Sequence, residues 1–153
     1  MNYLQDLGDA VVGEVLSRAR ERRSARELAD DATWSSYHQV RALFEATRSV
    51  LGPDAMHCVG EASLTSAAVP ELGDLLLGLG SPAALLGTLS LAAASMTTVV
   101  HSEATEVEPN HWQIVSRFGE GYEPFPEYCQ FSAGLFSIIP RLYGLPTGHV
   151  VEE

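Results

Sequence analysis

The sequence predicts an α+β domain with N-terminal helices packed on a small antiparallel sheet, in the order helices, β-hairpin, helix, strand. Apolar residues recur every three to four positions through most of the first 96 residues, which is the spacing of amphipathic helices. From Thr97 to Gly121 β-branched and alternating runs replace that spacing, and helical spacing returns from Pro126. The chain has 153 residues, 46% hydrophobic and 19% charged, so we expect one globular core.

Residues 1 to 30 are predicted to form an N-terminal helix that serves dimerisation or signalling. Helical spacing runs from Leu4 to Leu28, but only the first half carries an apolar face, which consists of Leu4, Leu7, Val11, Val15 and Leu16. The second half, RARERRSARE, is strongly charged. A short dimerising helix and a helix that packs on its own domain fit this pattern equally well.

The next helix is predicted from about Trp34 to Leu51. Its apolar stripe consists of Trp34, Tyr37, Val40, Leu43, Phe44 and Val50. Candidate N-caps precede it at Asp30, Asp31 and Thr33, and Gly52-Pro53 ends it.

Three shorter helices are predicted to follow: one that begins at Pro53-Asp54 and includes Ala62, one over 71–79 and one over 82–96. Most of the last two helices lies between Asp74 and Glu103, where no Asp, Glu, Lys or Arg occurs. This stretch is long enough to span a bilayer. A break at Gly80-Ser81-Pro82 interrupts it, since serine suits an N-cap and proline the first helical position. We therefore expect two helices and no membrane partner.

The remaining elements are a hairpin, a helix and a strand. The runs TTVVHSEATEVEP and NHWQIVSRFGEG predict a β-hairpin that turns at Glu108, Pro109 and Asn110. A buried helix is expected from about Pro126 to Tyr143, kinked or frayed near Pro140. The ending GHVVEE predicts the start of a strand, whose partner is the hairpin, another chain or sequence beyond this one.

Charge is unevenly distributed along the chain, and all nine basic residues are arginines. Residues 1–26 hold five arginines and four acids, whereas residues 27–153 hold four arginines and sixteen acids. Such an acidic body repels nucleic acid, although it also serves solubility. The N-terminus, MNYLQDLGDA, lacks the basic and apolar start of a secretory signal, so we expect a cytoplasmic location.

No catalytic motif is apparent, and we expect that the chain is not an enzyme. Gly-x-Ser-x-Gly is absent, and FGEGYEP has the spacing of a turn rather than of a phosphate loop. Cys58 and Cys129 lack the paired spacing of a zinc site, and the five histidines lack His-x-x-x-His spacing. No metal site is predicted, and the sequence identifies no cofactor.

Aromatic side chains are the best candidates for a binding site, because apolar walls with a few polar groups suit small ligands. We expect a small apolar or aromatic ligand between helices 34–51 and 82–96, the hairpin and helix 126–143. The predicted contacts are Trp34, Tyr37, Phe44, Leu89, Met96, Trp112, Phe118, Phe131 and Phe136. Tyr122, Phe125 and Tyr128 lie on or beside the same elements. All of these side chains would equally suit an ordinary core.

The segment YCQFSAGLFSIIPRLYGLPTGHVVEE, from Tyr128 to Glu153, resembles the C-terminal part of 4-vinyl reductase domains, in the wider group that includes haem-NO-binding domains. Cys129, Gly134 and Val150 to Glu152 match the family's helix-opening cysteine, its glycine and its strand that ends in glutamate. The segments TWSSYHQVRALFEATRSVLGPDAMHCVGE and LGSPAALLGTLSLAAASMTTVV resemble sensory modules that precede GGDEF or EAL output domains in actinobacterial signalling proteins. Together these segments cover residues 32–153.

The resemblance implies that residues 31–153 are a non-catalytic sensory domain, homodimeric and linked to cyclic-di-GMP turnover, with helices around a ligand cavity. The family's final hairpin and its later cysteines are absent because the chain stops at Glu153, which implies a domain truncated at that hairpin. Neither a cysteine-rich metal site nor haem binding is carried over, since no proximal histidine or Tyr-x-Ser-x-Arg motif is found. The alternative is a ligand-free dimerisation or adaptor domain.

Overall fold

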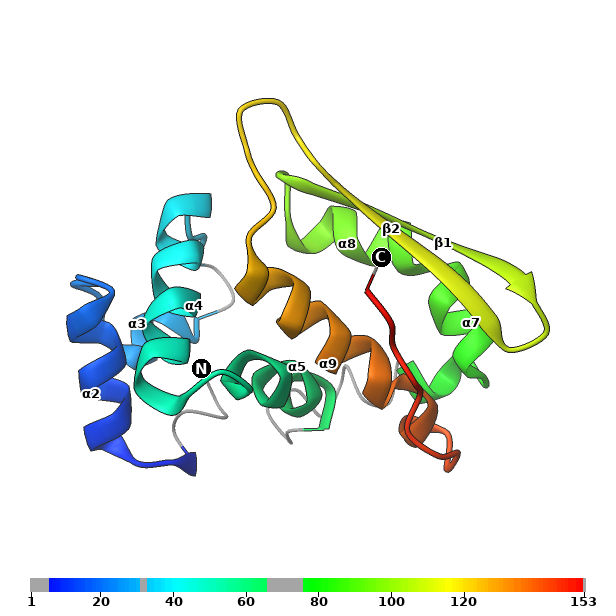
Figure 1. The fold of residues 1–153 in the computed structure, drawn as a ribbon, viewed down its shortest axis with the longest axis horizontal. Coiled ribbons are helices and arrows are strands. Elements are labelled where there is room, and N and C mark those ends of the chain that lie inside the picture. The colour runs from blue at the N-terminus through cyan, green and yellow to red at the C-terminus, as the bar shows by residue number, and fades with distance from the viewer. Residues whose placement is uncertain (1–5, 31–32, 66–75, 153) are drawn as a thin grey trace.

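A long helix, α9, lies between a helical N-terminal part and a β-hairpin (Figure 1). The computed structural model describes residues 6–30, 33–65 and 76–152. Its elements in chain order are α2 (Asp9–Arg18), α3 (Ala25–Leu28), α4 (Tyr37–Leu51), α5 (Ala55–Thr65), α7 (Pro82–Gly87), α8 (Leu89–Met96), β1 (Val100–Glu108), β2 (His111–Phe118) and α9 (Pro126–Leu142). Helices combined with a two-stranded antiparallel sheet confirm the predicted α+β class.

The apolar face of α2 packs on α4. Val12 and Val15 of α2 form a buried cluster with Ala46 of α4, and Val15 is 0% exposed. At the edge of this contact, Arg18 Nη1 donates a hydrogen bond of 2.6 Å to Ser49 Oγ. Val11, Val15 and Leu16 of the predicted apolar face are therefore used against the chain's own domain, whereas Leu7 is 43% exposed.

The prediction of one helix from Leu4 to Leu28 is wrong. Leu4 lies outside the described residues, α2 ends at Arg18, and α3 begins only at Ala25. The break occurs because Arg20 adopts a left-handed backbone conformation with φ 53°.

Two backbone hydrogen bonds define this helix end. The N–H of Arg20 donates to the Ser17 carbonyl, and the N–H of Glu21 donates to the Leu16 carbonyl. This pair is the Schellman ending, in which glycine is the usual left-handed residue. An arginine at that position costs about 1 kcal/mol, because its Cβ crowds the backbone.

Helix α4 begins at Tyr37, later than the predicted Trp34, because Ser36 is its N-cap. The Ser36 hydroxyl accepts a hydrogen bond from the Gln39 N–H, and the Gln39 side chain accepts one from the Ser36 N–H. This capping box satisfies two backbone donors at the start of α4. Of the caps predicted farther upstream, Asp31 lies outside the described residues. At the other end, Gly52 with φ 100° terminates α4 as predicted.

The segment predicted as one helix over 82–96 forms two helices, α7 and α8. Ser81 is the predicted N-cap of α7 and accepts a hydrogen bond of 3.1 Å from the Ala84 N–H. The helix breaks at Thr88, whose backbone departs from helical values and whose hydroxyl donates to the Leu85 carbonyl. Most of the predicted helix 71–79 lies outside the described residues. In the part of it that is described, residues 76–78 are helical. No helix within the described ranges is long and apolar enough to cross a membrane.

The predicted hairpin is confirmed. β1 and β2 pair in an antiparallel register from Val100 opposite Phe118 to Glu108 opposite His111, with an irregularity between Glu106 and Glu108. The turn follows Glu108 as expected, and Asn110 takes up φ 62° there. Helix α8 packs against β1, so the hairpin has one covered face.

Helix α9 ends one residue before its predicted bound, and its contact with α5 is the most extensive between two elements of the described part of the chain. It contacts α4, α5 and α7, and it buries Ile138 and Ile139. Its closest approach is to α5, where Gly60 and Gly134 lie against the backbone of the facing helix.

The predicted strand in GHVVEE is wrong: the described residues 145–152 form no strand. The Gly148 N–H instead donates a hydrogen bond of 2.7 Å to the Ser137 carbonyl of α9. The chain therefore turns back along α9, and neither hairpin strand pairs with it in the described part of the chain (Figure 1). A β-ladder needs a partner strand, and here a helix supplies the hydrogen-bond acceptor.

Candidate ligand-binding site

A group of aromatic rings joins α4, the end of β2, the following loop and the start of α9. We call it the aromatic cluster; its members are Tyr37, Phe44, Phe118, Tyr122, Phe125, Tyr128 and Phe131. Ring centroids are 5.0 Å apart for Tyr37 and Tyr122, 5.1 Å for Phe118 and Tyr128, and 5.3 Å for Phe44 and Phe131. Most pairs are edge-to-face, the geometry that the quadrupole of aromatic rings favours.

Phe125 is the centre of the aromatic cluster. Its ring is 3% exposed and lies 5.8 Å from Tyr37, 6.0 Å from Phe44 and 6.0 Å from Tyr128. The Arg41 guanidinium sits 5.6 Å from the centroid of the same ring. Phe125 is the N-cap residue of α9, so the extended loop before the helix delivers its side chain into the cluster.

A hydrogen bond ties α4 to that loop. The Tyr37 hydroxyl donates to the Glu123 carbonyl at 2.5 Å. Farther along α4, Arg48 Nη1 forms an ion pair of 2.8 Å with Glu127, in the first turn of α9. The position of α4 relative to α9 is therefore fixed by ring contacts and by two polar links.

Hydroxyl groups lie at the hairpin side of the aromatic cluster. Ser102 of β1 and Ser116 of β2 share a hydrogen bond of 2.9 Å. Burial raises the pKa of the Tyr128 phenol, and hydrogen bonds with Ser132, Ser116 and Ser102 oppose that rise. An apolar wall with a few hydroxyls at one edge is the composition of a small-molecule site.

Four of the nine predicted contact residues belong to the aromatic cluster: Tyr37, Phe44, Phe118 and Phe131. The other five do not. Trp34 is 64% exposed ahead of α4, and Met96 is 77% exposed at the end of α8, on which Leu89 also lies. Trp112 stands opposite Glu106 near the hairpin turn, and Phe136 lies farther along α9, half-buried.

The predicted contacts leave out the residues that hold the cluster together. Phe125 and Tyr128 each touch two or more other rings, and the Tyr122 ring meets the Tyr37 ring edge-to-face. The sequence signal that finds Phe125 is the pair Phe125-Pro126, because proline at the first helical position places the preceding side chain at the helix entrance.

Two surface hollows lie beside α4, and neither is lined by a member of the aromatic cluster. One, of about 450 Å³, is lined by Ala19, Arg20, Glu21, Arg22, Arg23, His38, Gln39 and Ala42. The other, of about 400 Å³, is lined by Glu45, Arg48, Ser49, Gly52, Pro53 and Glu127. The aromatic cluster is thus a packed surface with exposed edges. Charged side chains border both hollows, although most of the surface inside them is apolar.

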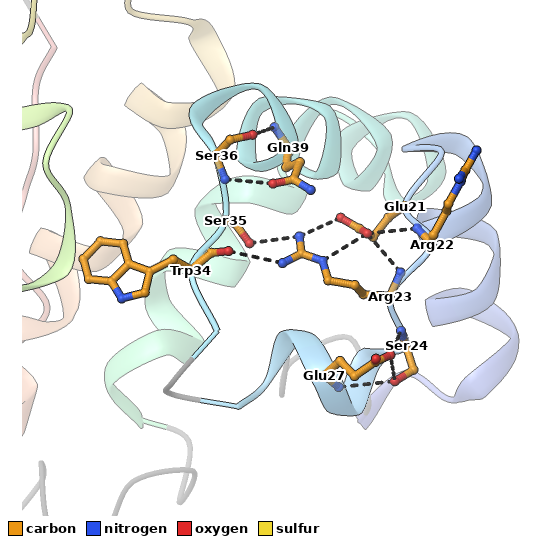
Figure 2. Close-up of polar contacts among 9 residues, drawn as sticks. All are labelled: Glu21, Arg22, Arg23, Ser24, Glu27, Trp34, Ser35, Ser36 and Gln39. Carbon is orange, nitrogen blue, oxygen red and sulfur yellow. Dashed lines mark hydrogen bonds and ion pairs between the residues drawn. The ribbon is translucent and has the colours of Figure 1, made fainter.

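Glu21 and Arg23, which line the first hollow and are two residues apart in the sequence, form an ion pair. Figure 2 shows that the Glu21 carboxylate accepts hydrogen bonds from the backbone N–H groups of residues 22 and 23 and from the Arg23 guanidinium. The distance from Arg23 Nη2 to Glu21 Oε2 is 2.8 Å. Arg23 also donates to the Trp34 carbonyl at 3.3 Å and to Ser35 Oγ at 3.2 Å. This network joins the segment after α2 to the segment before α4, while the Trp34 ring points away from it (Figure 2).

The Glu21 network predicts an acid-sensitive contact. Hydrogen bonds from the Arg23 side chain, and then from its backbone N–H, lower the pKa of Glu21 from 4.5 to about 2. A carboxyl whose pKa is lower in the folded state contributes stability above pH 4.5 and loses it as the pH falls toward about 2. We expect Glu21→Gln to be less stable than the wild type at neutral pH. Its urea midpoint should also fall less than that of the wild type as the pH drops from 4.5 to about 2. Identical acid profiles for the two proteins would contradict this prediction.

The two cysteines are unpaired, and both are partly buried. Burial raises the pKa of Cys129 to about 11, and the nearby Glu152 carboxylate adds to this effect. The thiol stays protonated at neutral pH, which makes it a poor nucleophile. Within the described residues no group of three or more His, Cys, Asp or Glu side chains is placed to hold a metal ion.

Comparison with protein-family models, with curated proteins and with solved structures gave no match. The resemblance of the C-terminal segment to 4-vinyl reductase domains therefore stays a hypothesis. In the structure two residues that carry it, Cys129 and Glu152, are neighbours, because the final segment runs back along α9.

Proposed function

We propose that the chain is a non-catalytic regulatory domain that senses a small apolar or aromatic molecule through the aromatic cluster. The observation that carries the proposal is that rings from α4, the hairpin end and α9 meet at one place with most of their edges part-exposed. Phe125 is fully buried, whereas Tyr122 is 40% exposed. A ligand ring that lies against Tyr122 and Tyr37 would gain contacts without opening a core.

Such a ligand would act on the position of α4. It shifts an equilibrium only by the difference between its affinities for two arrangements. Tyr37 is linked to the loop before α9 through Glu123, and α4 carries α2 through the Val15 cluster. A ligand that alters the Tyr37 contact would therefore change the pose of the N-terminal segment, which is the part expected to dimerise or signal.

Native mass spectrometry of the purified chain, together with an absorption spectrum, tests this proposal. We expect a small molecule to co-purify with the wild type and to be lost from Tyr122→Ala, whose ring edges the cluster. Trp34→Ala is the matched control, since its exposed ring lies outside the cluster and its removal should leave the bound mass in place. A chain that carries no bound mass, or a bound mass that Trp34→Ala removes and Tyr122→Ala retains, would overturn the assignment.

A second function, a ligand-free dimerisation or adaptor domain, is favoured by a separate observation. Leu77, Leu91 and Met96 are large apolar side chains in the segment from 76 to 96, and each is at least half exposed. Exposed apolar side chains that gather on one part of a protein commonly mark an interaction surface. An empty homodimer in the same mass spectrum would favour this function over ligand sensing.

The wider setting is also a proposal. We propose that the domain works in the cytoplasm, as a homodimer, beside a GGDEF or EAL output domain of an actinobacterial protein that makes or degrades cyclic-di-GMP. The support for this setting is the resemblance of Tyr128 to Glu153 and of the two earlier segments.

A further inference from the structure

The hollow of about 450 Å³ between the end of α2 and the start of α4 is bordered by basic side chains, although the chain as a whole is acidic. Three arginines and one acid line it. The acid, Glu21, is occupied by Arg23 and by two backbone N–H groups. Arg20 and Arg22 have no ion-pair partner among the residues that the structure describes, so two guanidinium charges are left at the hollow.

The backbone at Arg20 supports a role for its side chain. Arg20 occupies the left-handed position of a Schellman ending, where glycine is favoured and any side chain is strained. Residues held in sparsely populated backbone conformations cluster at binding and active sites. The arginine is thus held in place at a cost to the fold.

The far wall of the hollow is also suited to negative charge. It consists of His38 and Gln39, in the first turn of α4, with Ala42 one turn on. The backbone dipoles of a helix make its first turn slightly positive, which adds to the two free guanidinium charges. The Gln39 side chain is fixed by the Ser36 capping box, so this wall has one defined shape.

We propose that this hollow binds a small phosphate-bearing molecule, with Arg20 and Arg22 as the residues that contact the phosphate. The planar fork of a guanidinium matches two phosphate oxygens, and two free arginines match a dianion better than a monocarboxylate. The hollow is open to solvent, and its volume of about 450 Å³ lies within the roughly 300 to 1,000 Å³ of small-molecule sites, which leaves room for a phosphate together with a small organic group. The Glu21–Arg23 pair positions the segment that carries both arginines.

This site adjoins the aromatic cluster, since the His38 ring lies 5.3 Å from the Tyr37 ring, but it does not depend on the function proposed for the cluster. Tyr37 faces the cluster, whereas the next two residues of α4, His38 and Gln39, line the hollow. The rest of the chain repels a phosphate, since residues 27–153 carry sixteen acids and four arginines.

A titration of the ¹⁵N-labelled full chain with inorganic pyrophosphate, at about 0.05 M salt and constant ionic strength, tests the proposal by NMR. We expect saturable shifts of the amides of residues 20–23 and 38–39. Arg20→Gly should weaken binding at least tenfold although it relieves the backbone strain, so the loss cannot be attributed to misfolding. Arg22→Gln should weaken binding to a similar extent.

Arg26→Gln is the matched control. Arg26 lies on α3, does not line the hollow and has no ion-pair partner among the described residues. Its removal should change the affinity less than twofold. The proposal is overturned if the shifts do not saturate, if they arise elsewhere in the chain, or if Arg26→Gln weakens binding as much as Arg20→Gly.

Discussion

Gly134→Ala is expected to destabilise the chain by about 3 kcal/mol, because α9 has no room for a methyl group where it crosses α5. A Cβ at Gly134 would overlap the His57 carbonyl oxygen, would lie 2.9 Å from the His57 carbonyl carbon and 3.1 Å from the Glu61 nitrogen. These are backbone atoms, so no rotamer change relieves the overlap. The two helices would have to separate along their whole contact, which includes Met56, 1% exposed on α5.

Gly60 makes the reciprocal contact. A Cβ there would overlap the Phe131 carbonyl oxygen and would lie 2.8 Å from the Leu135 nitrogen. The paired glycines allow the backbones of α5 and α9 to meet directly, and Phe131 belongs to the aromatic cluster. Displacement of α9 would therefore also disturb the candidate ligand site.

Urea unfolding followed by circular dichroism measures the effect, with Gly13→Ala as the control. Gly13 lies inside α2, and a Cβ there meets nothing within 4 Å. Alanine should stabilise that helix by about 0.5 to 1 kcal/mol, since glycine is the poorer helix former. If Gly134→Ala unfolds at the urea midpoint of the wild type, the close crossing of α5 and α9 is incorrect.

The elements that the sequence predicted well are those with a local cause. The hairpin follows from alternation on both sides of a turn at Pro109 and Asn110, and α9 begins at Pro126 because proline suits the first helical position. The elements that were wrong have causes outside the local pattern. No glycine marks the end of α2, because Arg20 takes the left-handed position.

The final segment was mispredicted for a related reason. VVEE has the β-branched residues of a strand, but a strand requires a partner, and the Gly148 N–H bonds to α9 instead. Periodicity describes a segment's own preference and does not say which surface will supply its hydrogen bonds.

The candidate site was predicted in part. Tyr37 and Phe44 are seven residues apart on α4 and share a face, so helical spacing alone places them together. Leu89 and Met96 are predicted contacts because they lie on the helix expected over 82–96, but a helix that is apolar on all sides does not indicate which side is covered. Phe125 lies outside any periodic segment. Pro126 places it at the entrance of α9, but its contacts with the rings of α4 emerge only when α4, the loop and α9 are assembled.

Phe125→Ala is expected to lower the free energy of unfolding by about 3 to 5 kcal/mol, the usual cost of removing a buried phenylalanine. The change deletes the ring that touches Tyr37, Phe44 and Tyr128, and it also removes the surface on which Arg41 lies. Since a domain of this size has a total stability of about 5 to 15 kcal/mol, the variant should lose much of it. Phe125→Leu retains most of the apolar volume and should lose less.

Leu91→Ala is the control for that measurement, because Leu91 is 77% exposed and its truncation should change stability by less than about 0.5 kcal/mol. Urea unfolding of the three variants, followed by far-ultraviolet circular dichroism, gives the comparison. A loss below about 1.5 kcal/mol for Phe125→Ala would mean that the ring is not packed as its neighbours indicate. The aromatic cluster would then be a loose surface that does not hold α4 against α9, and a ligand bound to it could not move α4.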